Sequence, residues 1–144
     1  MPAVLDDRNG NTNQKGYVLV VDDEPLLCRM VSAMLMRAGY DTSIATNGRD
    51  ALQSVVQRAP DIITLDVMMP DMSGIEVARQ LRTNSQTAGI PIIFVTALDR
   101  SVSMDLRRFT EEPGVYHVDK PFSREQLLMQ VTIALQAKEG QFAI

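Results

Sequence analysis

The amino-acid sequence predicts a single α/β domain built as (βα)5, a doubly wound parallel sheet of five strands alternating with five helices. Short β-branched apolar runs alternate five times along the chain with longer segments whose apolar residues recur at helical spacing. The central runs are apolar almost throughout, as is typical of strands with helices on both faces of the sheet. This alternation favours right-handed crossovers between parallel strands, and we expect the strand order 2-1-3-4-5.

The predicted elements follow one another without a long gap. The strands are the runs YVLVV (17–21), TSIA (42–45), IITL (62–65), PIIFV (91–95) and VYHV (115–118). The helices are predicted by apolar residues at helical spacing within residues 27–38, 52–59, 75–81, 98–109 and 127–135. Gly39 and Pro60 end the first two helices, since glycine and proline are common just past a helix end.

Length and composition indicate one soluble globular domain. The 144 residues are 45% hydrophobic and 22% charged, which is enough to form a sizeable core. We expect a flexible polar arm at 1–16, the domain at 17–137 and a short tail at 138–144. The lone cysteine, Cys28, excludes an internal disulfide and a cysteine-based zinc site, and we expect it to be a buried structural thiol.

Charge and hydropathy restrict the partners and the compartment. The formal net charge of -4 argues against direct, sequence-independent nucleic-acid binding, which needs a basic face. No apolar run approaches the length of a membrane span, and the N-terminus lacks the pattern of a signal peptide. We therefore expect a cytoplasmic protein with no membrane attachment.

Polar residues follow four of the predicted strands at the point where each strand ends. These residues are Asp22 and Asp23, Asp66, Thr96, and Asp119 with Lys120. The carboxyl ends of parallel strands lie along one edge of the sheet, where ligands bind at the switch point of strand order. The strand order given above therefore predicts that Asp22, Asp23 and Asp66 converge on one pocket.

The acidic stretch VVDDEP (20–25) has two interpretations. Asp22 or Asp23 is either an N-cap for a helix that begins near Pro25, or part of a cation site. Clustered carboxylates repel one another and recruit a cation, and an all-oxygen ligand set suits a hard ion, most plausibly Mg²⁺. Lys120 and Thr96 could then help to bind a phosphoryl group, and a carboxylate can act as a nucleophile and become an aspartyl phosphate.

Four motifs in this order resemble those of the receiver domain of two-component response regulators, the CheY-like superfamily with a flavodoxin-like fold. They are VLVVDDEP (18–25), LDVMMPDMSG (65–74), VTA (95–97) and DKPF (119–122). The resemblance covers roughly residues 17–137. Each motif alone is a weak signal, but four of them, each at the end of a strand, form a specific combination.

The resemblance implies a role for each matching residue. Asp66 would be the phosphoacceptor, and Mg²⁺, with Mn²⁺ as the alternative, would be held by Asp22, Asp23, Asp66 and the backbone carbonyl of Met68. Lys120 would pair with Asp66 or its phosphoryl group, and Thr96, followed by Ala97, would turn toward that group on activation. The family commonly has a cis peptide bond before the proline of its last motif, here between Lys120 and Pro121.

The sequence departs from the family in two places. The family usually has Tyr or Phe three residues before the lysine, where this chain has His117. His117 is either a smaller aromatic switch that titrates near neutral pH or a half-exposed histidine on an edge strand. The segment between Thr96 and Lys120 is slightly long for the family, and we expect the extra residues at TEEPG (110–114).

As a receiver, the protein would be a signalling domain that assists its own phosphorylation and dephosphorylation, and not an enzyme acting on other substrates. Its partners would be a sensor histidine kinase or histidine phosphotransfer protein and an unidentified downstream protein or output domain. Output would pass through the face formed by helix 4, strand 5 and helix 5, which could also form a phosphorylation-dependent homodimer.

Three other functions compete with this interpretation. A Mg-dependent phosphatase or phosphotransferase commonly has a second acid two residues after its aspartyl nucleophile, where this chain has Met68. A nucleotide- or flavin-binding module would need a glycine-rich loop after the first strand, where this chain has acids. A receiver-like domain that has lost phosphorylation would lack some of Asp22, Asp23, Asp66, Thr96 and Lys120, and the sequence has all five.

Overall fold

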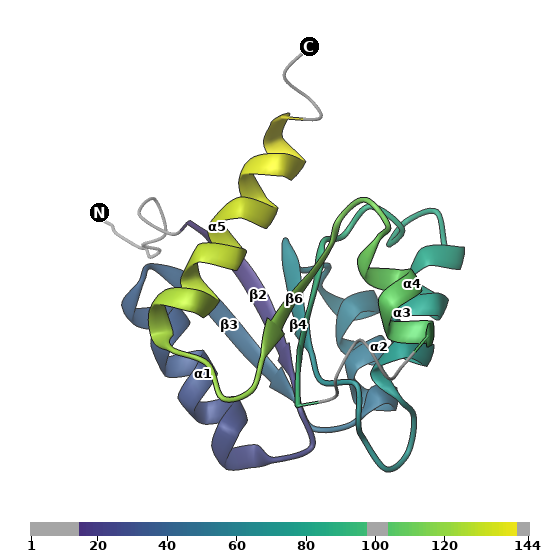
Figure 1. The fold of residues 1–144 in the computed structure, drawn as a ribbon, viewed down its shortest axis with the longest axis horizontal. Helices are drawn as coiled ribbons and strands as arrows, with labels where there is room; N and C mark the ends of the chain where they lie inside the picture. The colour runs from purple at the N-terminus through teal and green to yellow at the C-terminus, as the bar shows by residue number, and fades with distance from the viewer. Residues whose placement is uncertain (1–14, 98–103, 141–144) are drawn as a thin grey trace.

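The computed structural model describes residues 15–97 and 104–140, which form one parallel sheet with helices on both faces (Figure 1). The strands are β2 (Gly16–Val21), β3 (Tyr40–Ala45), β4 (Ile62–Leu65), β5 (Ile92–Thr96) and β6 (Val115–Asp119). The helices are α1 (Pro25–Arg37), α2 (Gly48–Gln57), α3 (Gly74–Thr83), α4 (Met104–Thr110) and α5 (Arg124–Gly140). None of the described helices has the length and apolar character needed to cross a membrane.

The sheet has the order β3-β2-β4-β5-β6, and each neighbouring pair is parallel. This is the predicted order 2-1-3-4-5, so the sequence prediction of the fold class is confirmed. Strand β3 lies on one side of β2, and β4 lies on the other side. Strands β2 and β4 are therefore neighbours, although β3 separates them in sequence. Both strands run toward the same edge, and the switch point of strand order therefore lies where β2 and β4 end.

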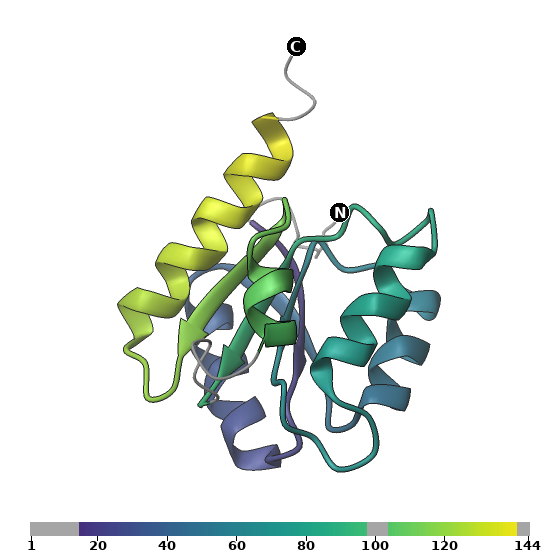
Figure 2. The same ribbon diagram turned by 45° about the vertical axis from the view of Figure 1, so that its right-hand side comes forward.

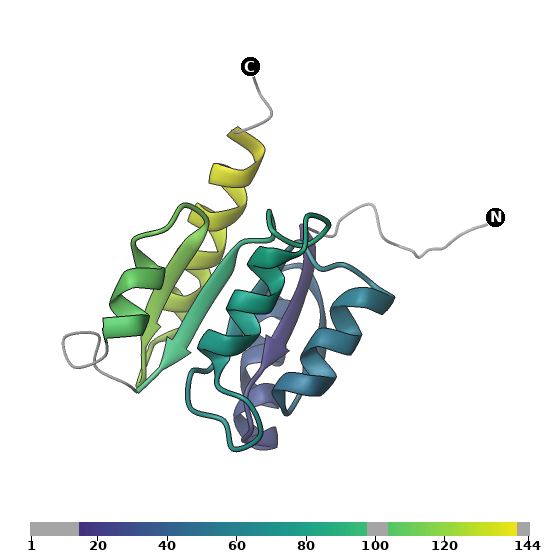
Figure 3. The same ribbon diagram turned by 90° about the vertical axis from the view of Figure 1, so that its right-hand side faces the viewer.

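The helices divide into two layers, as Figures 1 and 2 show. Helices α1 and α5 cover one face of the sheet, and their buried residues Cys28, Leu35, Leu127 and Val131 pack in one cluster with Val18 and Val20 of β2. Helices α2, α3 and α4 cover the other face, where α2 and α3 lie side by side (Figure 3). Because successive strand residues point to opposite faces, Leu19 and Val21 join this second core.

Local signals explain where several helices begin. Pro25 is the first residue of α1, a position where proline loses no helical hydrogen bond. The side chains of Asn47 and Ser73 cap α2 and α3 by accepting hydrogen bonds from the backbone N–H groups of Asp50 and Glu76. Of the two interpretations of the acidic stretch, the N-cap by Asp22 or Asp23 is wrong, because the residue at the N-cap is Glu24, whose side chain makes no cap hydrogen bond.

The start of β3 and the end of α5 are among the boundaries that differ from the expected ones. Strand β3 begins at Tyr40, before the predicted start at 42, because the Tyr40 ring is buried against the α1 and α5 layer. Helix α5 continues to Gly140, past position 137 where we expected the domain to end. Three predicted segments lie wholly or partly outside the described residues. They are residues 1–14 of the expected arm, residues 98–103 at the start of the fourth predicted helix, and the tail from 141.

Candidate phosphoryl and metal site

The three predicted acids come together at the carboxyl ends of β2 and β4. Val21 and Leu65 are partners in the register of these strands, so that the next residues, Asp22 and Asp66, lie side by side. The backbone N–H of Asp66 donates a 3.0 Å hydrogen bond to the carbonyl of Val21. Asp22 and Asp66 are 4% and 5% exposed, and Asp23 is half-buried. One carboxylate oxygen from each acid lies within 4.8 Å of the other two.

Asp22 also fixes the turn that leads into α1. Its Oδ1 accepts a 3.0 Å hydrogen bond from the backbone N–H of Glu24, and its backbone carbonyl accepts a 3.1 Å hydrogen bond from the thiol of Cys28. Cys28 is fully buried, and burial together with the nearby Asp22 carboxylate raises its pKa to about 11. The thiol is therefore a protonated structural group, as the sequence indicated.

Lys120 supplies the positive charge next to the acids. Its Nζ donates a 2.8 Å hydrogen bond to Oδ2 of Asp22 and lies 3.5 Å from Oδ2 of Asp66. Burial alone would lower the pKa of Lys120, but the hydrogen bond that Lys120 donates to Asp22 and the charges of Asp66 and Asp22 outweigh it and raise the pKa. The ammonium therefore stays charged at neutral pH between two buried carboxylates.

The backbone around Lys120 sets the position of this side chain. The peptide bond between Lys120 and Pro121 is cis. The backbone N–H of Lys120 donates a 3.0 Å hydrogen bond to the carbonyl of Thr96, which ties the loop after β6 to the end of β5. Thr96 is 1% exposed at that end, whereas Ala97, the next residue, is exposed.

The environment of Asp66 suits a carboxylate that gains from a nearby cation. Burial raises the pKa of Asp66, and the charge of Asp22 raises it further. The charge of Lys120 and a hydrogen bond from the backbone N–H of Met68, 3.4 Å from Oδ1, act in the opposite direction without overcoming burial. The carboxylate at position 66 is therefore destabilised unless more positive charge is supplied.

The acceptor loop, residues 66–74, is closed tightly behind Asp66. The backbone N–H of Gly74 donates a 2.9 Å hydrogen bond to the carbonyl of Val67. A Cβ atom on Gly74 would lie 2.1 Å from the carbonyl oxygen of Asp66. Only glycine fits at this position, because any side chain would collide with the backbone that carries the carboxylate. The side chain of Met68 is exposed at the start of the loop.

His117 lies on β6, away from the three acids. Its side chain is 11% exposed, and its Nε2 lies 3.0 Å from Oδ1 of the exposed Asp119, two residues along the strand and therefore on the same face. A pocket of about 220 Å³ between β6 and α5 is lined by His117, Asp119, Pro121 and Met129, among others. The two interpretations of His117, aromatic switch or edge histidine, both stay predictions.

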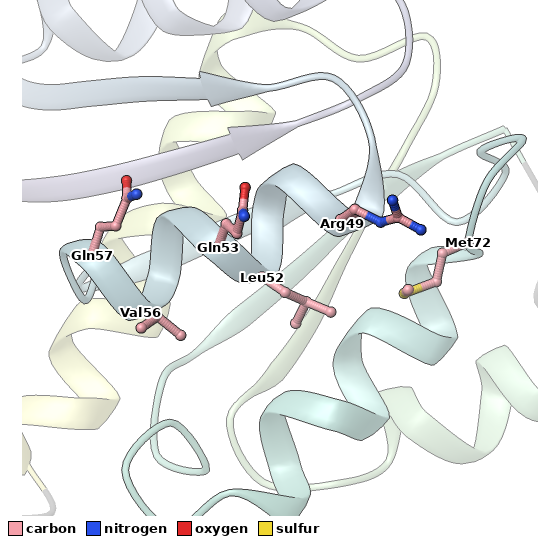
Figure 4. A pocket seen from close by; sticks show the side chains of 6 residues that line it. All are labelled: Arg49, Leu52, Gln53, Val56, Gln57 and Met72. Atoms are coloured by element: carbon pink, nitrogen blue, oxygen red, sulfur yellow. The ribbon is translucent and has the colours of Figure 1, made fainter.

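Sequence reasoning missed Asp71, a residue of the same loop. Its exposed carboxylate accepts hydrogen bonds from the backbone N–H groups of Gly48 and Arg49 at the start of α2. An acid in a motif already assigned to the acceptor loop gives no signal of a partner more than twenty positions away. Figure 4 shows the neighbouring pocket of about 390 Å³, where Arg49, Leu52 and Val56 of α2 and Met72 of the acceptor loop are among the lining residues.

The three acids fit a hard divalent cation. All side-chain donors are carboxylate oxygens, which Mg²⁺ prefers, and Asp23 is only half-buried, whereas Asp22 and Asp66 are buried. The single ammonium of Lys120 does not balance three carboxylates, so a net negative charge remains at this place for a cation to neutralise. The arrangement can therefore concentrate positive charge around one nucleophilic carboxylate.

Comparisons with known proteins agree with this geometry. Residues 18–132 match the response regulator receiver domain family. The probable transcriptional regulatory protein TcrX of Mycobacterium tuberculosis is 40% identical over 119 residues, 83% of this chain and 49% of that protein. The DNA-binding response regulator MtrA of Mycolicibacterium smegmatis is 36% identical over 124 residues, 86% of this chain and 52% of that protein. The chain spans about half the length of these curated relatives.

A solved structure supports the same relationship. The chemotaxis response regulator CheY4 of Vibrio cholerae superposes with a TM-score of 0.75 at 32% sequence identity. The match covers 83% of this chain and 98% of that chain.

Proposed function

Because the chain belongs to the response regulator receiver domain family of two-component systems, we propose that Asp66 is its phosphoacceptor. The observation that carries this proposal is the placement of Asp66 beside Asp22 and within 3.5 Å of Lys120, buried at the switch point of the sheet. The phosphoryl donor would be a phosphohistidine on a sensor histidine kinase or a histidine phosphotransfer protein. The domain is thus a signalling module rather than an enzyme that turns over a substrate.

The transfer step follows from the residues present. A carboxylate oxygen of Asp66 attacks the phosphorus atom, a P–O bond forms, and the P–N bond to the donor imidazole breaks. The donor imidazole, protonated on its other ring nitrogen, keeps the electron pair of that bond and leaves as neutral imidazole. Lys120 lies 3.5 Å from Oδ2 of Asp66 and would neutralise a phosphoryl oxygen there.

Asp22, Asp23, Asp66 and the backbone carbonyl of Met68 would hold Mg²⁺, or Mn²⁺ in its place. A bound cation of this kind neutralises phosphoryl oxygens and stabilises the deprotonated nucleophile. Asp22 already shares one oxygen with Lys120, which is consistent with its binding the cation through water and with Asp23 binding it directly.

Phosphorylation would change the surface at the ends of β5 and β6. Thr96 and Ala97 would move toward the phosphoryl group, and His117 would respond on β6. The output would be altered affinity of the face formed by α4, β6 and α5 for a downstream protein, an output domain or a second copy of the chain. MtrA is by name a DNA-binding response regulator, but the domain described here is acidic, and we propose that it contacts protein partners in the cytoplasm and no nucleic acid itself.

Intact-mass analysis after incubation with acetyl phosphate tests the proposal. We expect one phosphoryl adduct that needs Mg²⁺ and disappears in Asp66→Ala. Asp119→Ala is the matched control, because it removes an exposed acid at the end of β6, which β5 separates from β4, and it should keep the adduct. An adduct that persists in Asp66→Ala would move the acceptor to another carboxylate. Absence of an adduct in a folded wild type that binds Mg²⁺ would reject phosphorylation altogether.

A further inference from the structure

The acceptor loop is attached to a helix that takes no part in the acidic cluster. Asp71, in the middle of the loop, accepts hydrogen bonds from the backbone N–H groups of Gly48 at 3.2 Å and Arg49 at 3.3 Å. These hydrogen bonds lower the pKa of Asp71, and the one from Gly48 has the larger effect. The carboxylate is therefore charged at neutral pH. A negative charge at the N-terminus of a helix is also favoured by the helix dipole.

Helix α2 does not need Asp71 in order to begin. Asn47 is its N-cap, and the Asn47 side chain accepts a 2.8 Å hydrogen bond from the backbone N–H of Asp50. Asp71 satisfies two other N–H groups of the first turn, at Gly48 and Arg49, from a separate part of the chain. The helix start thus carries a local cap and, in addition, a long-range attachment to the loop that follows Asp66.

Close packing supports this attachment. A Cβ atom on Gly48 would lie 2.9 Å from Cβ of Met72 and 3.0 Å from Cγ2 of Val77, so the first residue of α2 fits against the loop and α3. Met72 and Arg49 both line the pocket of Figure 4, where the loop and α2 meet. The contact between α2 and the acceptor loop therefore combines two charge-assisted hydrogen bonds with a packed interface.

The rest of the loop shows what this attachment can control. The loop is anchored near Asp66 by the hydrogen bond between Gly74 and Val67, and near α3 by Ser73, which caps that helix. Between these anchors Met69 is buried, whereas Met68 and Asp71 are exposed. The hydrogen bonds of Asp71 hold this outer part of the loop against the start of α2.

We propose that Asp71 is a positioning residue for the phosphoacceptor site, which fixes the acceptor loop to the start of α2 and so holds the Met68 backbone in place for the cation. The inference rests on the proposed function, because it assumes that the cation binds beside Asp66. Asp71 touches neither the phosphoryl group nor the cation in this scheme. Its effect passes through the loop backbone, as for an outer-shell residue that orients metal ligands.

Titration of the full chain with MgCl2, followed by NMR of the backbone amides, tests the proposal. We expect Asp71→Ala to weaken Mg²⁺ binding by about tenfold, at the lower end of the effect of outer-shell groups. Asp71→Asn keeps an acceptor oxygen and should restore part of the affinity. Glu125→Ala is the matched control, since it removes an exposed acid from the first turn of a helix without touching the acceptor loop, and it should bind Mg²⁺ like wild type.

The same titration separates positioning from simple helix capping. In wild type, Mg²⁺ should shift the amide signals of Gly48 and Arg49 as well as that of Met68, and in Asp71→Ala the shifts at Gly48 and Arg49 should be lost. Unchanged Mg²⁺ affinity in Asp71→Ala would reduce Asp71 to a cap of α2 and overturn the inference while leaving the proposed function intact. A wild type that binds no Mg²⁺ would instead contradict the cation site and, with it, both proposals.

Discussion

Lys120 makes its shortest contact with Asp22, at 2.8 Å, and not with the proposed acceptor Asp66, which lies 3.5 Å away. One ammonium group therefore compensates two buried carboxylates unequally. A cation bound at Asp22 and Asp23 would compete with the ammonium for Asp22. The charge of Lys120 would then compensate mainly the carboxylate of Asp66. The stability of the unphosphorylated domain should then depend on both cations.

Replacement of Lys120 by Met should destabilise the protein in the absence of Mg²⁺. The substitution leaves Asp22 and Asp66 buried without the ammonium, and we expect a loss of about 2 kcal/mol in the free energy of unfolding, below the range for fully buried pairs. Urea unfolding with and without MgCl2 measures the effect, and Mg²⁺ should recover part of the loss. Lys138→Met, near the other end of α5, is the control. An equal deficit with and without Mg²⁺ would contradict competition for Asp22.

Asp66→Asn should stabilise the Mg²⁺-free protein at neutral pH. Below the ordinary pKa of 3.8, the carboxyl is protonated in both the folded and the unfolded state and costs nothing. As pH rises from 3.8 to the raised pKa of the folded state, the unfolded state loses its proton first, and stability falls. Above that window the full cost persists, about 1.4 kcal/mol for each unit by which the pKa is raised.

Urea unfolding of the wild type and Asp66→Asn at several pH values checks this sign. The advantage of Asp66→Asn should be largest at pH 7 and should shrink as the pH approaches 4. A wild type that is the more stable of the two at pH 7 without Mg²⁺ would show that Lys120 outweighs burial at this carboxylate.

Gly74→Ala should disrupt the acceptor loop. Its Cβ would lie 2.1 Å from the carbonyl oxygen of Asp66 and 3.0 Å from Cα of Val67, and backbone atoms cannot rotate away as a side chain does. We expect a loss of about 3 kcal/mol or more, the upper part of the range for overpacking. Gly89→Ala is the matched control, because a Cβ there meets nothing within 4 Å, and its melting temperature should be near that of wild type. Equal melting temperatures for the two variants would mean that the loop backbone moves to accommodate the added Cβ without loss of stability.

Periodicity predicted the strands and helices, and the expected strand order 2-1-3-4-5 then predicted the meeting of the acids. Val21 and Leu65 are the last residues of apolar runs, and parallel strands end at one edge, so Asp22 and Asp66 had to be neighbours once β2 and β4 were adjacent. Burial of Thr96 follows in the same way from its place at the end of a central strand. These features depend on where the strands end, which the apolar pattern indicates, and on the strand order, which we expected from the fold class.

Features that depend on side-chain direction were not predictable. Nothing in the sequence says that Lys120 bonds to Asp22 more closely than to Asp66, because two acids at the same edge are equivalent until the side chains are placed. Asp71 reaches α2 only because the acceptor loop folds over that helix. The pairing of His117 with Asp119, in contrast, could have been found, since residues two apart on a strand share a face.

The buried thiol that supports the acidic turn can also report on the local opening of α1. Cys28 is the only cysteine in the sequence, is fully buried and has a pKa of about 11, so almost none of it is reactive thiolate in the native state. An alkylating reagent can label it only after α1 separates from β2. The rate of alkylation at this single site therefore measures how often α1, the helix next to the acids, opens. The measurement needs neither a substitution nor an added label.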